Sequence, residues 1–210
     1  MIDISVCFVG PLMTNCYLLR DKATGAMAVV DPGGKSDKLI KEIEKNGRGL
    51  DYVILTHGHY DHIGYAKQLA EMFGAKVVGG FKINMFLNDN VLNHSRFHSE
   101  LDDIEPFDAD ILLNDGDTFM LGETVIKYIY TPGHTADSGC YIFDDSIICG
   151  DTLFCESYGR TDLPTGNDLD MINSLKRLKE IEGDYQVFPG HGMSTTLEYE
   201  RKNNPLMRRL

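Results

Sequence analysis

The chain has 210 residues, of which 42% are hydrophobic and 25% are charged. This length and composition predict one α/β domain over residues 1–210 with a sizeable core, and they exclude a disordered chain. The 20 basic and 32 acidic residues give a formal net charge of −12, which argues against nucleic acid as a partner because phosphate backbones attract lysine and arginine clusters. No feature of the sequence indicates a protein partner.

Targeting signals and cysteines point to the cytoplasm. Residues 1–6 lack a basic region ahead of an apolar stretch, so we expect a first strand there and no signal peptide. No apolar run is long enough to span a membrane. The five cysteines are odd in number and contain no CxxC pair, which indicates reduced thiols. Cys16, Cys140 and Cys149 lie in strand-like runs and are interpreted as small core residues, whereas Cys155 is interpreted as inert.

Strands and helices are expected to alternate along the chain. Apolar runs near the N-terminus predict a meander of three strands, at residues 2–9, 16–20 and 26–31. Apolar side chains at helical spacing predict three helices, at residues 37–46, 62–73 and 168–181. Gly47 and Gly74 are natural stops for the first two. Residues 81–110 are the least regular part, and we expect them to cross between the two halves of the fold and to form one wall of a cleft.

The segment 57–62, with the sequence HGHYDH, follows the apolar run 52–55, where a strand ends and a helix begins. A core has no use for three imidazoles and a carboxylate in six residues, because buried polar groups need partners. Imidazole and carboxylate together are ligands for borderline metals such as zinc, iron and manganese. A solvated, histidine-rich turn is the alternative, and the further candidate ligands in the chain disfavour it.

Three more apolar runs are each followed by a turn and then a candidate ligand. The runs are residues 126–130, 147–149 and 186–188, and the ligands are His134, Asp151 and His191. A lone histidine after a strand is usually a surface or core residue, but four such strand ends in one chain favour a shared site at one edge of the sheets. His94 and His98 follow no such run and are interpreted as surface residues.

These motifs resemble the signature of the metallo-β-lactamase superfamily, an HxHxDH motif followed by a His, an Asp and a His. The resemblance covers essentially the whole chain, including the turns Asp-Pro-Gly-Gly at 31–34 and Asp-Gly-Asp at 115–117. It implies a single-domain α/β fold, a four-layer αββα sandwich. Within the superfamily, GDTLF at 150–154 and GRTDLP at 159–164 resemble the short bacterial glyoxalase II-like (hydroxyacylglutathione hydrolase-like) enzymes.

The resemblance also implies two divalent metal ions. The first would be held by His57, His59 and His134, the second by Asp61, His62 and His191, and Asp151 would bridge the two. Zinc is the favoured metal, and iron and manganese are alternatives because mixed His and carboxylate sites accept all three. Asp31 is either a hydrogen-bond acceptor behind a ligating imidazole or an acidic turn residue before Pro32.

Such a site predicts a metal-dependent hydrolase. Two metals roughly 3.5–4 Å apart can share a hydroxide that attacks a carbonyl. A small thioester, hydroxyacyl-glutathione-like, suits this chemistry because its thiolate leaving group needs no strong general acid. The expected catalytic residues are Asp151, as the bridge, and Asp61, which would orient the attacking water or accept its proton.

Tyr158 and Arg160 are candidates for binding a substrate carboxylate, although Arg160 could equally pair with Asp162. Full-length glyoxalase II enzymes add a C-terminal helical domain that supplies much of the glutathione contact, whereas only residues 192–210 follow His191 here. We therefore expect modest selectivity for the thiol half of a thioester.

Other functions fit part of the pattern. GRTD at 159–162 also resembles persulfide dioxygenases, in which a single ferrous iron would be held by His57, His134 and Asp151. A hydrolase of lactones or other esters is a third possibility. A non-catalytic metal-binding module is disfavoured because no expected ligand is missing.

Overall fold

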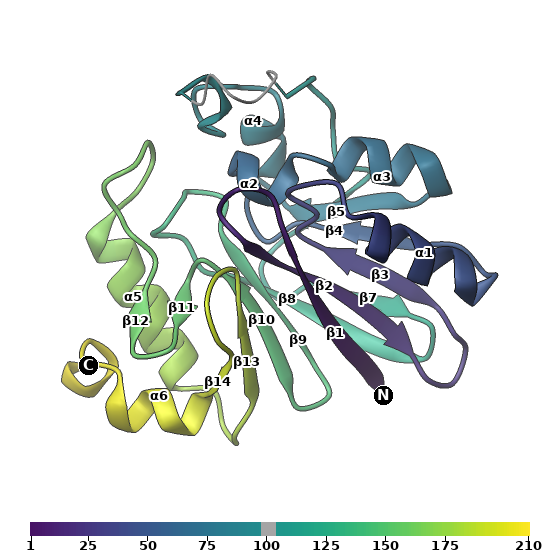
Figure 1. Cartoon of the computed structure of the whole chain (residues 1–210). Coiled ribbons are helices and arrows are strands. Elements are labelled where there is room, and N and C mark those ends of the chain that lie inside the picture. The colour runs from purple at the N-terminus through teal and green to yellow at the C-terminus, as the bar shows by residue number, and fades with distance from the viewer. Residues whose placement is uncertain (98–103) are drawn as a thin grey trace.

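The fold is built around two β-sheets that pack face to face, as the computed structural model of residues 1–97 and 104–210 shows (Figure 1). Ile54 and Val78 of the first sheet pack with Tyr128 and Tyr141 of the second in a buried layer between them. Helices cover the outer face of each sheet. The predicted four-layer αββα sandwich is therefore confirmed.

The first sheet has six strands in chain order: β1 (Ile2–Val9), β2 (Thr14–Asp21), β3 (Met27–Val30), β4 (Tyr52–Ile54), β5 (Lys76–Gly80) and β6 (Ile111–Leu113). The first three form an antiparallel meander, as the sequence predicts, although the second strand begins at Thr14 rather than at residue 16. From β3 to β6 the strands run parallel. The carboxyl ends of β3 and β4 therefore lie at one edge.

The second sheet has the strand order β14-β13-β10-β9-β8-β7. Its strands are β7 (Thr118–Leu121), β8 (Thr124–Tyr130), β9 (Gly139–Phe143), β10 (Ser146–Gly150), β13 (Gln186–Pro189) and β14 (Thr195–Thr196). Since β9 is antiparallel to both β8 and β10, and β10 is parallel to β13, three strands point the same way. A small hairpin, β11 (Leu153–Phe154) with β12 (Ser157–Tyr158), extends beyond β10.

Six α-helices are described: α1 (Asp37–Asn46), α2 (Tyr60–Ile63), α3 (Ala66–Phe73), α4 (Ile83–Leu87), α5 (Asp168–Lys179) and α6 (Leu197–Asn203), with 3₁₀ turns η1 (Ser95–Phe97) and η2 (Met207–Arg209). Leu39 and Leu69 from α1 and α3 pack on the first sheet, and Leu175 and Leu197 from α5 and α6 pack on the second. None of the described helices has the length and apolar character needed to cross a membrane.

The first predicted helix and the core cysteines are confirmed. The helix covers residues 37–46, begins after Ser36, whose side chain accepts a hydrogen bond from the Leu39 amide, and ends at Gly47 with φ 70°. A left-handed residue at this position is how many helices stop, and glycine adopts it without strain. The three cysteines interpreted as core residues, Cys16, Cys140 and Cys149, are all buried.

Two predictions about organisation are wrong. The predicted helix at 62–73 is broken into α2 and α3, because the Tyr65 amide donates to the carbonyl of Pro32 at 2.9 Å instead of continuing the helix. Residues 81–110 do not cross between the sheets, since β5 and β6 are parallel neighbours in the first sheet. The chain passes from the first sheet to the second at residues 114–117, where the Asn114 amide donates to the carboxylate of Asp117 at 2.7 Å.

Candidate metal centre

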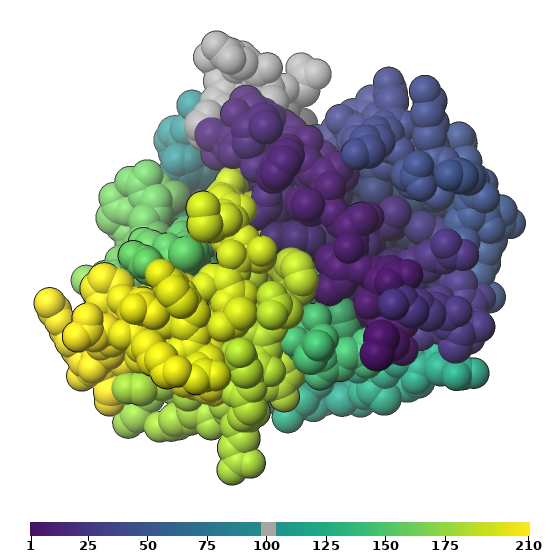
Figure 2. Space-filling model, turned by 60° about the horizontal axis from the view of Figure 1, so that its bottom comes forward, coloured from purple at the N-terminus to yellow at the C-terminus, as the bar shows by residue number. Residues whose placement is uncertain are grey.

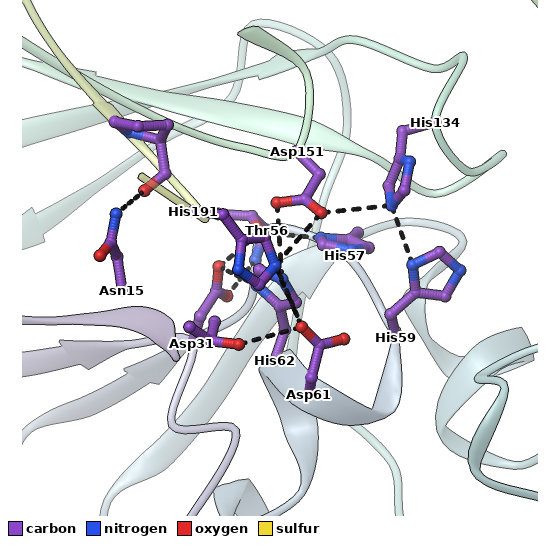
Figure 3. A network of polar contacts seen from close by, with 12 residues as sticks. Asn15, Asp31, Thr56, His57, His59, Asp61, His62, His134, Asp151 and His191 are labelled. Atoms are coloured by element: carbon purple, nitrogen blue, oxygen red, sulfur yellow. Dashed lines mark hydrogen bonds and ion pairs between the residues drawn. The ribbon is translucent and has the colours of Figure 1, made fainter. Parts of the chain in front are cut away.

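All seven predicted ligand residues meet at the edge where the parallel strands of both sheets end (Figure 3). The segment that follows β4 supplies four of them, His57, His59, Asp61 and His62. The other three follow the ends of β8, β10 and β13, namely His134, Asp151 and His191. The strand-end pattern read from the sequence thus corresponds to one shared edge in three dimensions.

His57, His59 and His134 form one group of inward-facing nitrogens whose ligand atoms lie within 4.8 Å of one another. His59 Nδ1 and His134 Nε2 are 2.9 Å apart, and His57 Nε2 is buried without a hydrogen-bond partner. Burial, with the neighbouring imidazoles, holds the pKa values of His57 and His59 well below the usual range. Both rings are therefore neutral and offer lone pairs to a cation.

Asp61, His62 and His191 form a second group within the same distance limit. His62 Nε2 lies 3.4 Å from His191 Nε2 and 3.4 Å from Asp61 Oδ2, and His191 Nε2 lies 3.1 Å from the same oxygen. Burial raises the pKa of Asp61, but His62 and His191 outweigh it and lower that pKa overall. The carboxylate is therefore ionised.

Asp151 lies between the two groups. Its Oδ1 is 3.5 Å from His62 Nε2, and its Oδ2 is 3.5 Å from His134 Nε2 and 3.6 Å from His191 Nε2. Oδ1 is buried and has no hydrogen-bond partner. Asp151 is thus the ligand residue with a carboxylate oxygen toward each group.

The outer ring nitrogens of three histidines are held by acceptors behind them. His134 Nδ1 donates to the carbonyl of Arg160 at 2.8 Å, and His62 Nδ1 is 2.9 Å from Asp31 Oδ2. The Thr56 hydroxyl donates to Asp31 at 2.6 Å, which leaves its oxygen to accept from His57 Nδ1 at 3.1 Å. Each pairing directs the opposite nitrogen, Nε2, inward, as metal-ligating histidines require.

Asp31 is therefore the acceptor behind a ligating imidazole, one of the two interpretations that the sequence allows. Distance alone also groups it with His57 and His62 as a possible ligand. Its oxygens, however, already accept from the Thr56 amide at 2.8 Å and the Thr56 hydroxyl, and contact His62 Nδ1. With these contacts Asp31 holds Thr56 and His62 in place behind the inward-facing nitrogens.

This arrangement fits divalent cations. Buried nitrogens that face one another with lone pairs repel unless a cation or proton lies between them, and a buried carboxylate oxygen without a partner is costly. Burial opposes charge on His62, yet Asp61, Asp151 and Asp31 outweigh it and raise its pKa to about 10. The same negative charges that favour a proton there favour a metal ion.

Further residues support the ligands without being evident from the sequence motifs. The Thr14 hydroxyl donates to Asp61 Oδ2 at 2.9 Å, and the Asn15 amide group donates to the carbonyls of Pro189 and Gly192, each at 2.9 Å, holding the turn that carries His191. The available signal is a polar pair at the start of a buried, largely apolar strand. Asp137 is also buried and lies next to Gly58 of the ligand segment, since a Cβ built at Gly58 would be 3.2 Å from Asp137 Oδ2.

An open pocket of about 600 Å³ leads to the metal centre. Tyr158 and Arg160 line it, as the sequence predicts, but Arg160 forms a two-pronged ion pair with Asp162, with both N···O distances 2.6 Å. His94 also lines this open pocket and belongs to none of the ligand groups, which agrees with its interpretation as a surface residue rather than a ligand. The expected cleft wall within residues 81–110 is present there. His98 lies outside the described residues.

The family follows from both sequence and fold. The profile of the metallo-beta-lactamase superfamily matches residues 9–191, and the chain belongs to this superfamily. Hydroxyacylglutathione hydrolase GloC of Haemophilus influenzae is 32% identical over 209 residues, covering 98% of each chain. The crystal structure of BLEG-1 B3 metallo-beta-lactamase superimposes with a TM-score of 0.89 at 29% identity, over 98% of this chain and 99% of that one.

Other similar proteins differ in what their names state. A probable zinc-dependent hydrolase of polyketide biosynthesis, PksB of Bacillus subtilis, is 31% identical over 84% of this chain and 72% of its own. TTHA1623, solved in a di-iron-bound form, has a TM-score of 0.82 at 28% identity, covering 96% and 98% of the two chains. ETHE1 of Myxococcus xanthus has a TM-score of 0.76 at 28% identity, covering 97% and 83%. The names of these similar proteins thus include a zinc-dependent hydrolase and a di-iron-bound protein.

Proposed function

We propose that the protein is a dinuclear metal-dependent hydrolase of small thioesters of the hydroxyacyl-thiol kind. One observation carries the proposal: Asp151 has one oxygen toward His62 and the other toward His134, so that two complete ligand groups share a carboxylate. Such a pair of neighbouring sites is the arrangement expected of two-metal hydrolases. The likeness to GloC supports the thioester as substrate.

Two divalent ions bound here would activate a water molecule and polarise the substrate carbonyl. We assign His57, His59 and His134 to one ion, Asp61, His62 and His191 to the other, and Asp151 to both. We favour zinc, as the name of PksB suggests, over iron or manganese.

Asp61 is the residue that we assign to orienting the attacking water or accepting its proton. It lines the pocket, and its Oδ2 is held by the Thr14 hydroxyl at 2.9 Å. In the reaction the water oxygen bonds to the carbonyl carbon, the carbon–sulfur bond breaks, and the sulfur leaves as a thiolate. A thiolate is stable enough near neutral pH that the pocket needs no strong general acid at the sulfur.

A persulfide dioxygenase is the alternative. His134 Nε2 and Asp151 Oδ2 are 3.5 Å apart, and with His57 they could form a two-histidine, one-carboxylate iron site. This function would leave the second group, with Asp61 and His191, without a metal to bind, and we therefore rank it below the hydrolase. A lactone or ester hydrolase would use the same seven residues.

Two assays on the same metal-loaded enzyme separate these functions. One follows free thiol released from S-lactoylglutathione and other lactoyl thioesters, and the other follows oxygen uptake with glutathione persulfide. We expect thiol release without oxygen uptake. Oxygen consumption with sulfite formation and no thioester cleavage would replace the hydrolase with the iron enzyme, and cleavage of lactones alone would replace the thioester as substrate.

A further inference from the structure

The residues that line the pocket outside the metal centre determine which kind of thiol half a substrate can have. Bound cations would offset the charges of Asp61 and Asp151, so the remaining lining residues decide which group is attracted. Leu12, Phe154 and Leu163 present apolar surface there, together with the rings of Tyr60 and Tyr158. A carboxylate placed against such walls loses water without gaining a partner.

Arg160 is the one lysine or arginine among the described lining residues of this pocket, and it is already paired. Its guanidinium holds both oxygens of Asp162 at 2.6 Å, in the geometry that a substrate carboxylate would need. The bond to Arg160 lowers the pKa of Asp162 to about 2, so both partners are charged near neutral pH. The net charge of the Arg160–Asp162 pair is therefore zero.

Exposed apolar side chains continue beside Leu12. Leu12 is 51% exposed, and Met13 and Met193 are 58% and 71% exposed. These residues lie on two turns that Asn15 joins, since its backbone amide donates to the Gly190 carbonyl at 2.8 Å. Figure 2 shows the N-terminal segment and the C-terminal part side by side on one face. Flexible methionine side chains adapt to apolar ligands of irregular shape.

From these observations, and resting on the thioesterase activity proposed above, we infer that the thiol half of the substrate is uncharged and apolar. Glutathione carries two carboxylates, and neither finds an unpaired cation on the described walls. A short apolar thiol would instead bury its surface against Leu12, Phe154 and Leu163. Burying a few methylene groups is sufficient to favour such a thiol by about tenfold or more.

The test compares two lactoyl thioesters on the zinc-loaded enzyme at pH 8, one of glutathione and one of benzyl mercaptan. Each kcat/KM is divided by the rate at which hydroxide alone hydrolyses that ester, which removes the difference in leaving group. We expect the normalised value for the benzyl ester to exceed that for the glutathione ester by about tenfold or more. The opposite preference would overturn the inference.

Two charge variants sharpen the comparison. Leu12→Lys adds a cation to the wall, and Asp162→Asn frees Arg160 from its partner. Each should shift the preference toward the glutathione ester by roughly tenfold. Met72→Lys is the matched control, because it adds the same charge at a residue that is 51% exposed on α3, away from the pocket. It should leave the preference unchanged.

The outcomes separate two failures. If the enzyme cleaves both esters but Leu12→Lys and Asp162→Asn shift the preference no more than Met72→Lys does, the inference about the pocket walls is wrong and the thioesterase remains. If the metal-loaded enzyme cleaves neither ester, the proposed function is wrong and the inference falls with it.

Discussion

The first sheet delivers His57, His59, Asp61 and His62 from one segment after β4, whereas the second delivers His134, Asp151 and His191 from three separate strands. The four ligands after β4 keep their spacing through a local turn. Asp151 and His191 depend on the register of β10 and β13, where the Gly190 amide donates to the Gly150 carbonyl at 2.8 Å. A Cβ at Gly190 would lie 2.1 Å from Asp151 Oδ1, so this close approach requires glycine. The ligands of the first sheet therefore meet those of the second only when both sheets are in place.

The largest effect should come from Asp151→Asn, because Asp151 has oxygens toward both groups. Losing its negative charge would weaken both metal sites and leave the repulsion between the two cations unshielded. We expect kcat/KM for a lactoyl thioester to fall on the order of 10³-fold, together with a loss of metal measured by elemental analysis. Full metal content with near-normal turnover would show that Asp151 does not bridge.

His191→Ala should affect one metal site rather than both. It removes one of three residues from the second group and leaves His57, His59 and His134 intact. The expected result is a fall in metal content from close to two ions per chain toward one, measured by elemental analysis. The control is His94→Ala, which alters the same pocket outside the ligand groups and should leave the metal content unchanged. Equal losses in the two variants would refute the assignment.

Asp31→Asn should have a smaller effect, because Asp31 positions His62 and Thr56 without binding the ion. Residues that hold a ligating imidazole usually contribute roughly 10–100-fold to metal affinity. We expect a loss of zinc affinity in that range, measured by competition with a chromogenic chelator. Asp162→Asn removes a carboxylate from the pocket rim instead and should not change zinc affinity; the same loss in both variants would contradict the role of Asp31.

Asp137→Asn should change the pH dependence of stability. Burial raises the pKa of Asp137 in the folded protein to about 7, above an unfolded value near 3.9. The stabilisation from the protonated form is therefore complete below about pH 4 and is lost as the pH rises through about 7, by about 1.4 kcal/mol per pH unit over that interval.

The asparagine variant lacks this loss. Denaturant unfolding of both proteins at pH 5 and pH 8 gives the free energy of unfolding of the variant minus that of the wild type. We expect this difference to be ~2–3 kcal/mol larger at pH 8 than at pH 5. Taking the difference between proteins at each pH cancels the pH dependence of metal binding that they share. An equal difference at both pH values would mean that Asp137 does not titrate in this interval.

How far the sequence predicts the site depends on the same contrast between ligands from one segment and ligands from three separate strands. The HGHYDH segment at 57–62 is recognisable because its residues are contiguous, and the other ligands are recognisable because each follows a strand. The sandwich, the first helix and the core cysteines could be predicted from periodicity and resemblance. Contacts between distant segments could not, because no local pattern reports them.

Particular residues show why. Thr14 and Asn15 contact Asp61 and the turn at 189–192 only after β2 and β13 are brought together. The helix at 62–73 breaks because a distant carbonyl, that of Pro32, accepts the Tyr65 amide, whereas its apolar spacing favours one continuous helix. Likewise, the pairing of Arg160 with Asp162 rather than with a substrate is a choice between two partners that sequence alone leaves open.

The metal content of the wild-type protein tests the central claim most directly. Protein purified without chelator, and the same protein stripped and titrated with Zn²⁺ in a calorimeter, should each bind close to two divalent ions per chain, because two groups of three ligand residues share Asp151. A stoichiometry of one ion per chain in both experiments, or one iron and no other metal, would contradict the dinuclear site.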